Sequence, residues 1–298
     1  MMSARFLTVV LERAFNMRDG FGREIDYMRI SVIDSCNLNC YYCNPCDNNE
    51  HCHALNILSV KEVLCIVRAA TRLGIKHFRL TGGEPLLHPQ LDEMVLQIKK
   101  IPGVSSVSLT TNAVLLAQHA KWLKEAGIDS INVSLDTIDA SEYERITKKP
   151  LLEEVKHGIN AAIECGIRVK INVVLTPQTD VVALTRYVAK KGTDIRFIEM
   201  MPVGEGHTNG VEPYKKVIGT LSKLYGEPCR INTEKTKEIN SGNNKRKIPD
   251  NGPAEYYIFP ELGIRVGLIQ AIHGKFCDTC NRIRVTADGR LMPCLGSS

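Results

Sequence analysis

The chain has 298 residues, of which 44% are apolar and 24% are charged, and its formal net charge is +5. This length and composition are typical of one large or two ordinary globular domains, and the modest charge suits anionic small molecules better than nucleic acid. No apolar stretch approaches the roughly 20 residues that cross a bilayer, and Glu12 and Arg13 interrupt the apolar segment near the N-terminus. We therefore expect a cytoplasmic protein that binds neither nucleic acid nor a membrane.

A strand-then-helix rhythm runs from residue 27 to residue 200, which is typical of parallel strands joined by crossover helices. We predict an α/β fold, an incomplete (βα)6 barrel of the TIM type, whose chemistry gathers at the carboxyl ends of the strands. The expected strands are 27–33, 77–81, 107–110, 130–135, 168–175 and 195–200, and the expected helices are 59–73, 89–100, 114–126, 152–165 and 179–191.

The rhythm changes after residue 210. A helix is expected at about 212–225, a stretch rich in Gly, Pro, Asn and Lys at 240–253 indicates an exposed loop or linker, and three later segments alternate like short antiparallel strands. These segments are 254–259, 264–269 and 282–286. We divide the chain into an N-terminal extension that closes onto the barrel (1–26), the partial barrel (27–210) and a smaller cluster-binding C-terminal region (211–298).

The chain has eleven cysteines, which is many for its length. In a reducing compartment, clustered cysteines are more often metal ligands or redox groups than disulfides. The scattered Cys65, Cys165 and Cys229 are expected to be packing residues. The others form a first group, Cys36, Cys40, Cys43, Cys46 and Cys52, and a second group, Cys277, Cys280 and Cys294.

Each group contains a set of three cysteines: Cys-xxx-Cys-xx-Cys in the first, and Cys-xx-Cys followed by a more distant Cys in the second. Three thiolates can hold three irons of a cubane 4Fe-4S cluster and leave the fourth iron open to another ligand. Zinc is the alternative on spacing alone, because Cys46 or Cys52 could complete a four-ligand site and the second group equally fits half of a zinc ribbon. A zinc-dependent binding or regulatory protein is therefore the rival from another functional class.

Four cations interrupt apolar strand segments, where a solvated charge has no place: Arg29, Arg79, Lys170 and Arg196. A single such residue would most often belong to a salt bridge, and Arg196 has Glu199 or another nearby carboxylate as a possible partner. Four of them on the inner strands of one barrel favour a cavity that binds an anion.

Two segments together, CNLNCYYC (36–43) and TGGEP (81–85), resemble the cluster signature and the glycine-rich motif of the radical S-adenosylmethionine (SAM) superfamily. The likeness to one of its families, the molybdenum cofactor biosynthesis protein A family or GTP 3′,8-cyclases, runs from about residue 17 to 295. It is carried by segments such as LTGGEPLL, INVSLDTID, IRFIEMMPVG and FCDTCNRIRVTADGRLMPCL.

The resemblance implies two 4Fe-4S clusters and SAM as cofactors. Cys36, Cys40 and Cys43 would hold the cluster that binds SAM, and the open iron of the second cluster would help to bind guanine. The ligands of that second cluster would be Cys277, Cys280 and Cys294; SAM would be contacted by Tyr42, Gly83, Ser134 and Met201, and GTP by Arg29, Arg79, Thr110, Lys170, Arg282 and Arg284.

The implied activity is that of a lyase that converts GTP to (8S)-3′,8-cyclo-7,8-dihydroguanosine 5′-triphosphate, the first step of molybdopterin biosynthesis, through a 5′-deoxyadenosyl radical. The implied partners are an electron donor and the downstream cyclic pyranopterin monophosphate synthase, and the chain would be a monomer or a homodimer. The alternative within enzymes is a radical SAM enzyme with an auxiliary cluster that acts on a peptide or another substrate.

The sequence departs from the family in three places. Cys46 and Cys52 are additional, and we expect them to be loop thiols. His77 stands where some members have a lysine. The longer members continue to a Gly-Gly tail, whereas this sequence stops four residues after Cys294, so we expect either a short natural form or a truncated chain.

Overall fold

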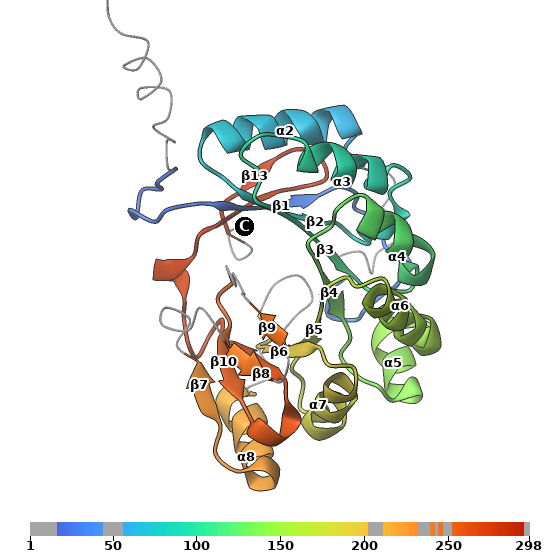
Figure 1. Cartoon of the computed structure of the whole chain (residues 1–298), viewed down its shortest axis with the longest axis vertical. Coiled ribbons are helices and arrows are strands. Elements are labelled where there is room, and N and C mark those ends of the chain that lie inside the picture. The colour runs from blue at the N-terminus through green and yellow to red at the C-terminus, as the bar shows by residue number, and fades with distance from the viewer. Residues whose placement is uncertain are drawn as a thin grey trace, which may run out of the picture.

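The computed structural model describes residues 17–43, 56–201, 211–231, 239–241, 244–246 and 252–294. A curved sheet of eleven strands surrounds a central hollow, with helices on its outer side (Figure 1). Six parallel strands follow one another in chain order: β1 (Tyr27–Ser31), β2 (His77–Thr81), β3 (Ser106–Thr111), β4 (Ser130–Ser134), β5 (Val169–Val174) and β6 (Asp194–Ile198). The predicted incomplete barrel of six βα units is thereby confirmed.

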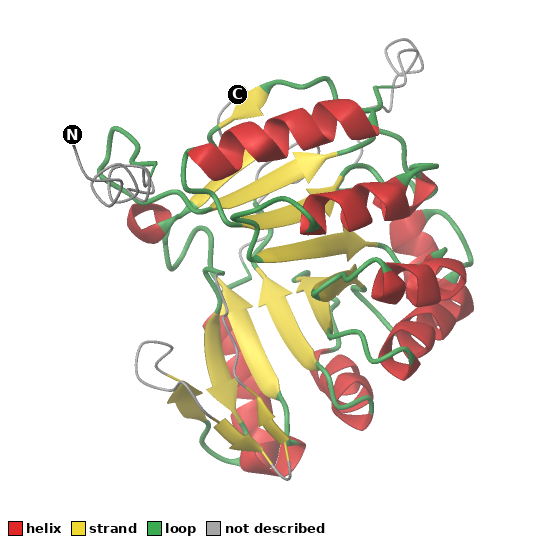
Figure 2. Ribbon diagram, turned by 45° about the horizontal axis from the view of Figure 1, so that its top comes forward, coloured by secondary structure: helices red, strands yellow, loops and turns green. Residues whose placement is uncertain are grey.

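Helices follow the strands around the outer side of the sheet (Figure 2). The five predicted helices are present, and they are α2 (Val60–Arg72), α3 (Leu91–Lys99), α4 (Leu116–Glu125), α6 (Leu152–Glu164) and α7 (Val181–Lys190). No helix in the described part of the chain is long and apolar enough to cross a membrane.

One further helix, α5 (Ala140–Thr147), was not predicted. It begins at Asp139, whose side chain accepts a hydrogen bond from the Glu142 amide at 2.8 Å and so caps the first turn. Tyr143 and Ile146 are its buried apolar side chains. Two apolar positions in eight residues are too few for a periodic signal, so the sequence pattern did not indicate it.

The C-terminal segments extend both edges of the barrel sheet; the predicted antiparallel pairing is present, but two of these strands also pair in parallel with the barrel, which was not predicted. β11 (Arg265–Ile269) pairs in parallel with β6, and β12 (Arg282–Val285) pairs in parallel with β1. Antiparallel pairing is found for β10 (Glu255–Ile258) with β11 and with β7 (Cys229–Ile231), and for β12 with β13 (Leu291–Met292). Strands from the end of the chain therefore cover the backbone groups that an open barrel would leave unpaired at β1 and β6.

The predicted helix after residue 210 is confirmed as a π-helical stretch (Tyr214–Ile218) that continues into α8 (Gly219–Tyr225). The stretch predicted to be a loop or linker contains a short hairpin of β8 (Ile239–Ser241) and β9 (Asn244–Arg246).

The hydrophobic core lies between the sheet and the outer helices. Ile30, Leu80 and Leu109 on consecutive strands are completely buried there, together with Val63 and Val67 of α2. Each such side chain stabilises the fold by about 1.5 to 3 kcal/mol relative to exposure. Because neighbouring residues of a strand point to opposite faces, burial of these positions turns the residues before and after them toward the hollow.

Candidate active site

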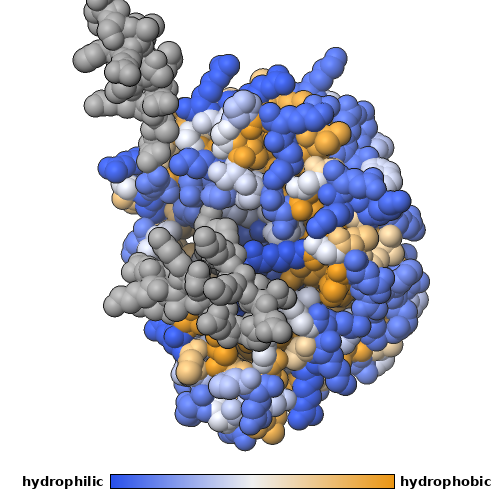
Figure 3. All heavy atoms as spheres, in the orientation of Figure 1, coloured by the Kyte–Doolittle hydropathy of each residue, from blue (hydrophilic) through white to orange (hydrophobic). Residues whose placement is uncertain are grey.

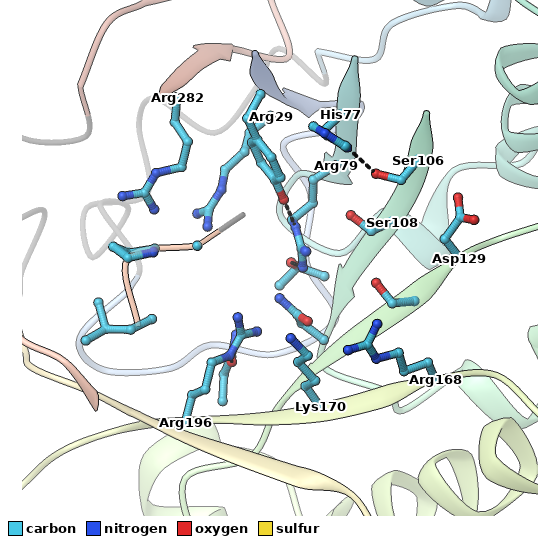
Figure 4. A pocket seen from close by; sticks show the side chains of 18 of the residues that line it. Arg29, His77, Arg79, Ser106, Ser108, Asp129, Arg168, Lys170, Arg196 and Arg282 are labelled. Atoms are coloured by element: carbon cyan, nitrogen blue, oxygen red, sulfur yellow. Dashed lines mark hydrogen bonds between the residues drawn. The ribbon is translucent and has the colours of Figure 1, made fainter. Parts of the chain in front are cut away.

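A cavity of about 410 Å³ lies on the inner side of the sheet. Hydrophilic residues are visible in the hollow at the centre of the molecule (Figure 3), and in close-up the cationic side chains of several strands converge on one space (Figure 4). One carboxylate, Asp129, is found among the described lining residues, and it accepts a hydrogen bond from Lys99 at 2.9 Å. The cations are Arg29, Arg79, Arg168, Lys170, Arg196 and Arg282. Such an excess of positive charge favours a polyanionic ligand.

Three arginines meet on neighbouring strands at one end of this cavity. Arg29 on β1 is in register with Arg79 on β2 and with Arg284 on β12. Burial, and next the charge of Arg284, lowers the pKa of Arg29 to about 9. Its Nε is buried without a hydrogen-bond partner among the described residues. Buried donors that lack a partner, next to like charges, are poised to bind an anion.

Arg79 is held in place by two oxygen atoms. Its Nε donates to the Tyr27 hydroxyl, and its Nη1 donates to Thr110 Oγ1 at 3.4 Å. Burial opposes ionisation of Tyr27, but Arg79 and Arg29 outweigh it, and the pKa of Tyr27 lies below its ordinary value. Thr110 thus lies at the cationic end of the cavity.

Lys170 approaches the cavity from β5. Its Nζ lies 3.5 Å from the Tyr256 hydroxyl and 5.7 Å from the centre of that ring. Gly267 makes room here, because a Cβ atom at this position would lie 2.8 Å from Arg196 Cγ and 2.9 Å from Tyr256 Cε1. A glycine is therefore required at this position of β11 for the side chains of Arg196 and Tyr256 to lie where they do.

The suggested pairing of Arg196 with Glu199 is wrong. Arg196 Nε donates to Asn172 Oδ1 at 2.9 Å, whereas Glu199 accepts bonds from the Ile272 amide at 2.7 Å and from the backbone and ring of His273. The two residues face opposite sides of the sheet, because they are separated by an odd number of positions. Arg196 therefore stays with the cavity, and its Nη2 is buried without a partner in the described part of the chain.

The first cysteine loop begins just after β1, at the carboxyl end of the strand. The Asn39 and Tyr41 amides donate to carbonyls at the end of α5, at 3.0 and 3.1 Å. Tyr42 donates to Asp136, whose other oxygen accepts from the Val174 amide at 2.7 Å. Burial raises the pKa of Asp136 to about 6. The unpredicted helix and this carboxyl group thus fix the position of the loop.

The TGGEP segment packs directly on the chain that enters this loop. A Cβ at Gly82 would lie 2.3 Å from the Ile33 carbonyl oxygen, and one at Gly83 would lie 2.1 Å from the Ser35 carbonyl oxygen. The glycines are therefore needed for a close backbone contact. A hydrogen bond of 2.7 Å from the Glu84 amide to the Ser35 carbonyl oxygen stabilises this contact.

Glu84 itself is buried and accepts hydrogen bonds from Thr111 Oγ1 and the Asn112 amide, both at 2.7 Å. Burial raises its pKa to about 7. This carboxyl group therefore links the end of β2 to the end of β3. The link lies beside the first cysteine loop, since the Asn112 side chain is 3.7 Å from Cys36 Sγ.

The donor atoms of the first loop fit an iron-sulfur cluster in kind. Cys36, Cys40 and Cys43 are all free thiols on one loop, and burial raises the pKa of each, that of Cys40 to about 12. Thiols of this kind become thiolates when iron supplies the compensating charge. Within the described ranges, no three His, Cys, Asp or Glu side chains are already gathered in ligand geometry.

The second cysteine group lies at the opposite, amino end of β1. The Tyr27 amide donates to the Asn281 carbonyl at 3.2 Å, and Arg23 Nη1 donates to the Cys277 carbonyl at 2.6 Å. Burial works against ionisation of Cys280, but Arg282 outweighs it and lowers the pKa of this thiol. Cys294 follows the short β13, which returns antiparallel to β12. The cavity therefore lies between the two cysteine groups.

The expected SAM contacts lie at the carboxyl ends of the strands, around the first cysteine loop. Tyr42 is in that loop, Gly83 follows β2, Ser134 ends β4 and Met201 comes shortly after β6. Four of the expected GTP contacts, Arg29, Arg79, Thr110 and Lys170, line the cavity together with Arg282, while Arg284 is next to Arg29 in the sheet. Cys46 and Cys52 lie outside the described residues.

Several residues that line the cavity were not predicted as site residues: His77, Asn132, Arg168 and Asn172. Most of them lie two residues from a predicted site residue in the same strand segment. The period of two along a strand could have found them.

Comparison with known proteins places the chain in a family. The profile of the radical SAM superfamily matches residues 30–184, and that of Molybdenum Cofactor Synthesis C matches residues 193–298. GTP 3′,8-cyclase of Clostridium perfringens (strain SM101 / Type A) is 37% identical over 282 residues, which is 94% of this chain and 83% of that protein. GTP 3′,8-cyclase of Pelotomaculum thermopropionicum is 38% identical over 286 residues, 94% of this chain and 84% of that protein.

Solved structures support the fold. Streptococcus suis SuiB bound to S-adenosylmethionine superposes with a TM-score of 0.63 at 14% identity, over 91% of this chain and 60% of that one. The native enzyme anSMEcpe with bound AdoMet gives a TM-score of 0.53 at 20% identity, over 67% of this chain and 60% of that one. The chain thus spans about three fifths of these structures. From its full-length relatives and both matching profiles, the chain belongs to the GTP 3′,8-cyclase family of the radical SAM superfamily.

Proposed function

We propose that this chain converts GTP to (8S)-3′,8-cyclo-7,8-dihydroguanosine 5′-triphosphate, the first step of molybdopterin biosynthesis. The observation that carries the proposal is the cationic cavity between two cysteine groups at opposite ends of β1. A triphosphate needs several charge-assisted hydrogen bonds, and guanidinium groups supply them in pairs. Six cations and one neutralised carboxylate among the described lining residues meet that need.

SAM and an iron-sulfur cluster are cofactors of this enzyme family. We assign the cluster to Cys36, Cys40 and Cys43. We place SAM at the carboxyl ends of the strands around this loop, where it would contact Tyr42, Gly83, Ser134 and Met201. When bound, cluster and SAM supply the radical chemistry that removes hydrogen from the ribose 3′ carbon, so that this carbon bonds to guanine C8. The chain orients both molecules and excludes water from the reacting atoms.

The GTP contacts divide along the cavity. Arg282 and Arg284 on β12 adjoin the second cysteine group, which supports placing guanine there. Arg79 and Lys170, with Thr110, lie farther along the wall and would bind the triphosphate. Arg29, whose Nε has no partner in the described chain, lies between them.

A second 4Fe-4S cluster at Cys277, Cys280 and Cys294 is part of the proposal. Its support is the placement of three thiols next to Arg23, Arg282 and Arg284, which would offset the negative charge of thiolates and inorganic sulfide. Two cubane clusters predict about 8 iron atoms per chain. An external electron donor, the downstream cyclic pyranopterin monophosphate synthase as functional partner, and a cytoplasmic monomer or homodimer complete the proposal.

The test is anaerobic incubation of reconstituted protein with SAM, a reductant and GTP. We expect GTP to increase the formation of 5′-deoxyadenosine above the level seen with SAM and reductant alone, and the cyclised nucleotide to form with it. Arg282→Ala should abolish the nucleotide product. Arg290→Ala is the matched control, because Arg290 is exposed on the same segment and pairs with Asp288. Equal SAM cleavage with and without GTP, and no cyclised product, would overturn the assignment.

A further inference from the structure

His77 is the one imidazole among the described residues that line the cavity. It begins β2, in register with Tyr27 on one side and Ser106 on the other. Its Nδ1 lies 2.8 Å from Ser106 Oγ, and its ring stacks on Tyr27 with 6.4 Å between the centres (Figure 4). Nothing in the described chain forms a hydrogen bond with Nε2, so this nitrogen is available to a ligand.

The surroundings of the ring contain no uncommitted counter-charge. Burial lowers the pKa of His77, which favours the neutral ring. The two nearby carboxylates are already bound, Asp26 by Asn281 Nδ2 at 2.6 Å and Asp129 by Lys99 and by the Val107 amide. The charged and titratable groups facing the ring are Asp26 and Tyr27 from the β1 side, Lys76 and Arg79 on its own strand, Asp129 before β4, and Arg168 across the cavity.

We propose that His77 binds the phosphate groups of GTP and takes up a proton when they bind. This rests on the proposed function, because GTP with its guanine beside Arg282 would extend its triphosphate toward the starts of β2, β3 and β5. His77, Arg168 and the Ser106 hydroxyl lie there. A phosphate oxygen would supply the counter-charge that the ring lacks, and Nε2 would donate to it.

The consequence is a pH dependence of affinity. Because the complex would hold the His77 proton more tightly than the free enzyme, GTP affinity should rise as the pH falls through the neutral range. Raising the pKa of the ring by one unit on binding corresponds to about a tenfold change in affinity.

The experiment is calorimetric titration of the anaerobic holoprotein with GTP, without SAM, at about pH 6.5 and about pH 8, in buffers of different protonation enthalpy. Wild type is compared with His77→Gln, which cannot ionise, and with His77→Lys, which keeps a positive charge at both pH values. The proton that GTP itself gains or loses is common to all three proteins, so differences between them report residue 77.

We expect the wild type to take up more protons than either variant, and to lose about threefold more affinity than they do between the two pH values. His77→Gln should bind weakly at both, and His77→Lys tightly at both. Equal proton uptake and equal pH slopes in all three proteins would overturn the inference. Failure of all three to bind GTP would instead overturn the proposed function, and either variant alone suffices for the comparison.

Discussion

The two cysteine groups lie at opposite ends of the same strand, in opposite electrostatic surroundings. At the carboxyl end of β1, the buried carboxyl groups of Glu84 and Asp136 adjoin the first group, and burial raises the pKa of its thiols. At the amino end, Arg23 and Arg282 surround the second group and lower the pKa of Cys280 against burial. Carboxyl groups suit the cationic sulfonium and ammonium of SAM, whereas guanidinium groups suit an anionic nucleotide. On the proposed function, two groups of three cysteines would thus serve two kinds of ligand because their neighbours differ.

The largest effect that would test this comparison is loss of the first group. Cys40→Ala should remove about 4 of about 8 iron atoms and abolish SAM cleavage, because three thiolates are the minimum for this cluster. The measurements are an iron and sulfide count and 5′-deoxyadenosine formation. Cys46→Ala is the matched control on the same segment and should leave both unchanged; loss of iron there would restore the four-ligand zinc interpretation.

Loss of a cysteine from the second group should separate SAM cleavage from the cyclisation of GTP. Cys277→Ala should also lower the iron content by about 4 atoms, but SAM cleavage with reductant should persist while cyclised GTP disappears. Iron analysis with product chromatography checks this. A variant that retains all of its iron, or makes normal amounts of product, would show that the second group is not a cluster site.

A smaller effect concerns the glycine contact that is specific to the first group. Gly83→Ala forces a Cβ to 2.1 Å from the Ser35 carbonyl oxygen, and we expect the free energy of unfolding to fall by about 3 kcal/mol. Gly219→Ala is the control, since it begins a helix at φ −61° with nothing within 4 Å of the added Cβ. It should be neutral or stabilise by up to about 1 kcal/mol. Denaturant unfolding under anaerobic conditions measures both; equal values would mean that the loops move apart without strain.

The last expected effect is a pH dependence due to Glu84, similar in total size but spread over several pH units. Burial raises its pKa from 4.5 to about 7, so the folded protein binds this proton more tightly than the unfolded chain does. The resulting stabilisation is present below about pH 4.5 and is lost as the pH rises through about 7, a change on the order of 3 kcal/mol. Glu84→Gln should lose that part of the slope in unfolding measurements between about pH 5 and pH 8. Parallel curves for the two proteins would contradict a raised pKa.

Local sequence patterns were sufficient to predict the six barrel strands, because alternation and βα spacing are properties of contiguous segments. They were not sufficient for β11 and β12, whose parallel partners β6 and β1 are set by sheet edges and not by neighbouring residues. The short α5 was missed for lack of periodicity. His77 and Arg168 lie two residues before Arg79 and Lys170, so the period of two indicates the face that they share with these cations. How far the cavity extends toward the starts of the strands is set by the closed sheet and could not be predicted.

The bond from Arg23 to the Cys277 carbonyl spans 254 positions of the chain, and that from Asn281 to Asp26 spans 255. Contacts so far apart in sequence make barrel closure a late event, since the loop entropy must be overcome before the last strand can pair. During synthesis, β1 emerges long before β12, its partner in the sheet. The chamber between the two cysteine groups is therefore completed only after β12 has been made, so a nascent chain that lacks β12 has no closed space in which to shelter a radical.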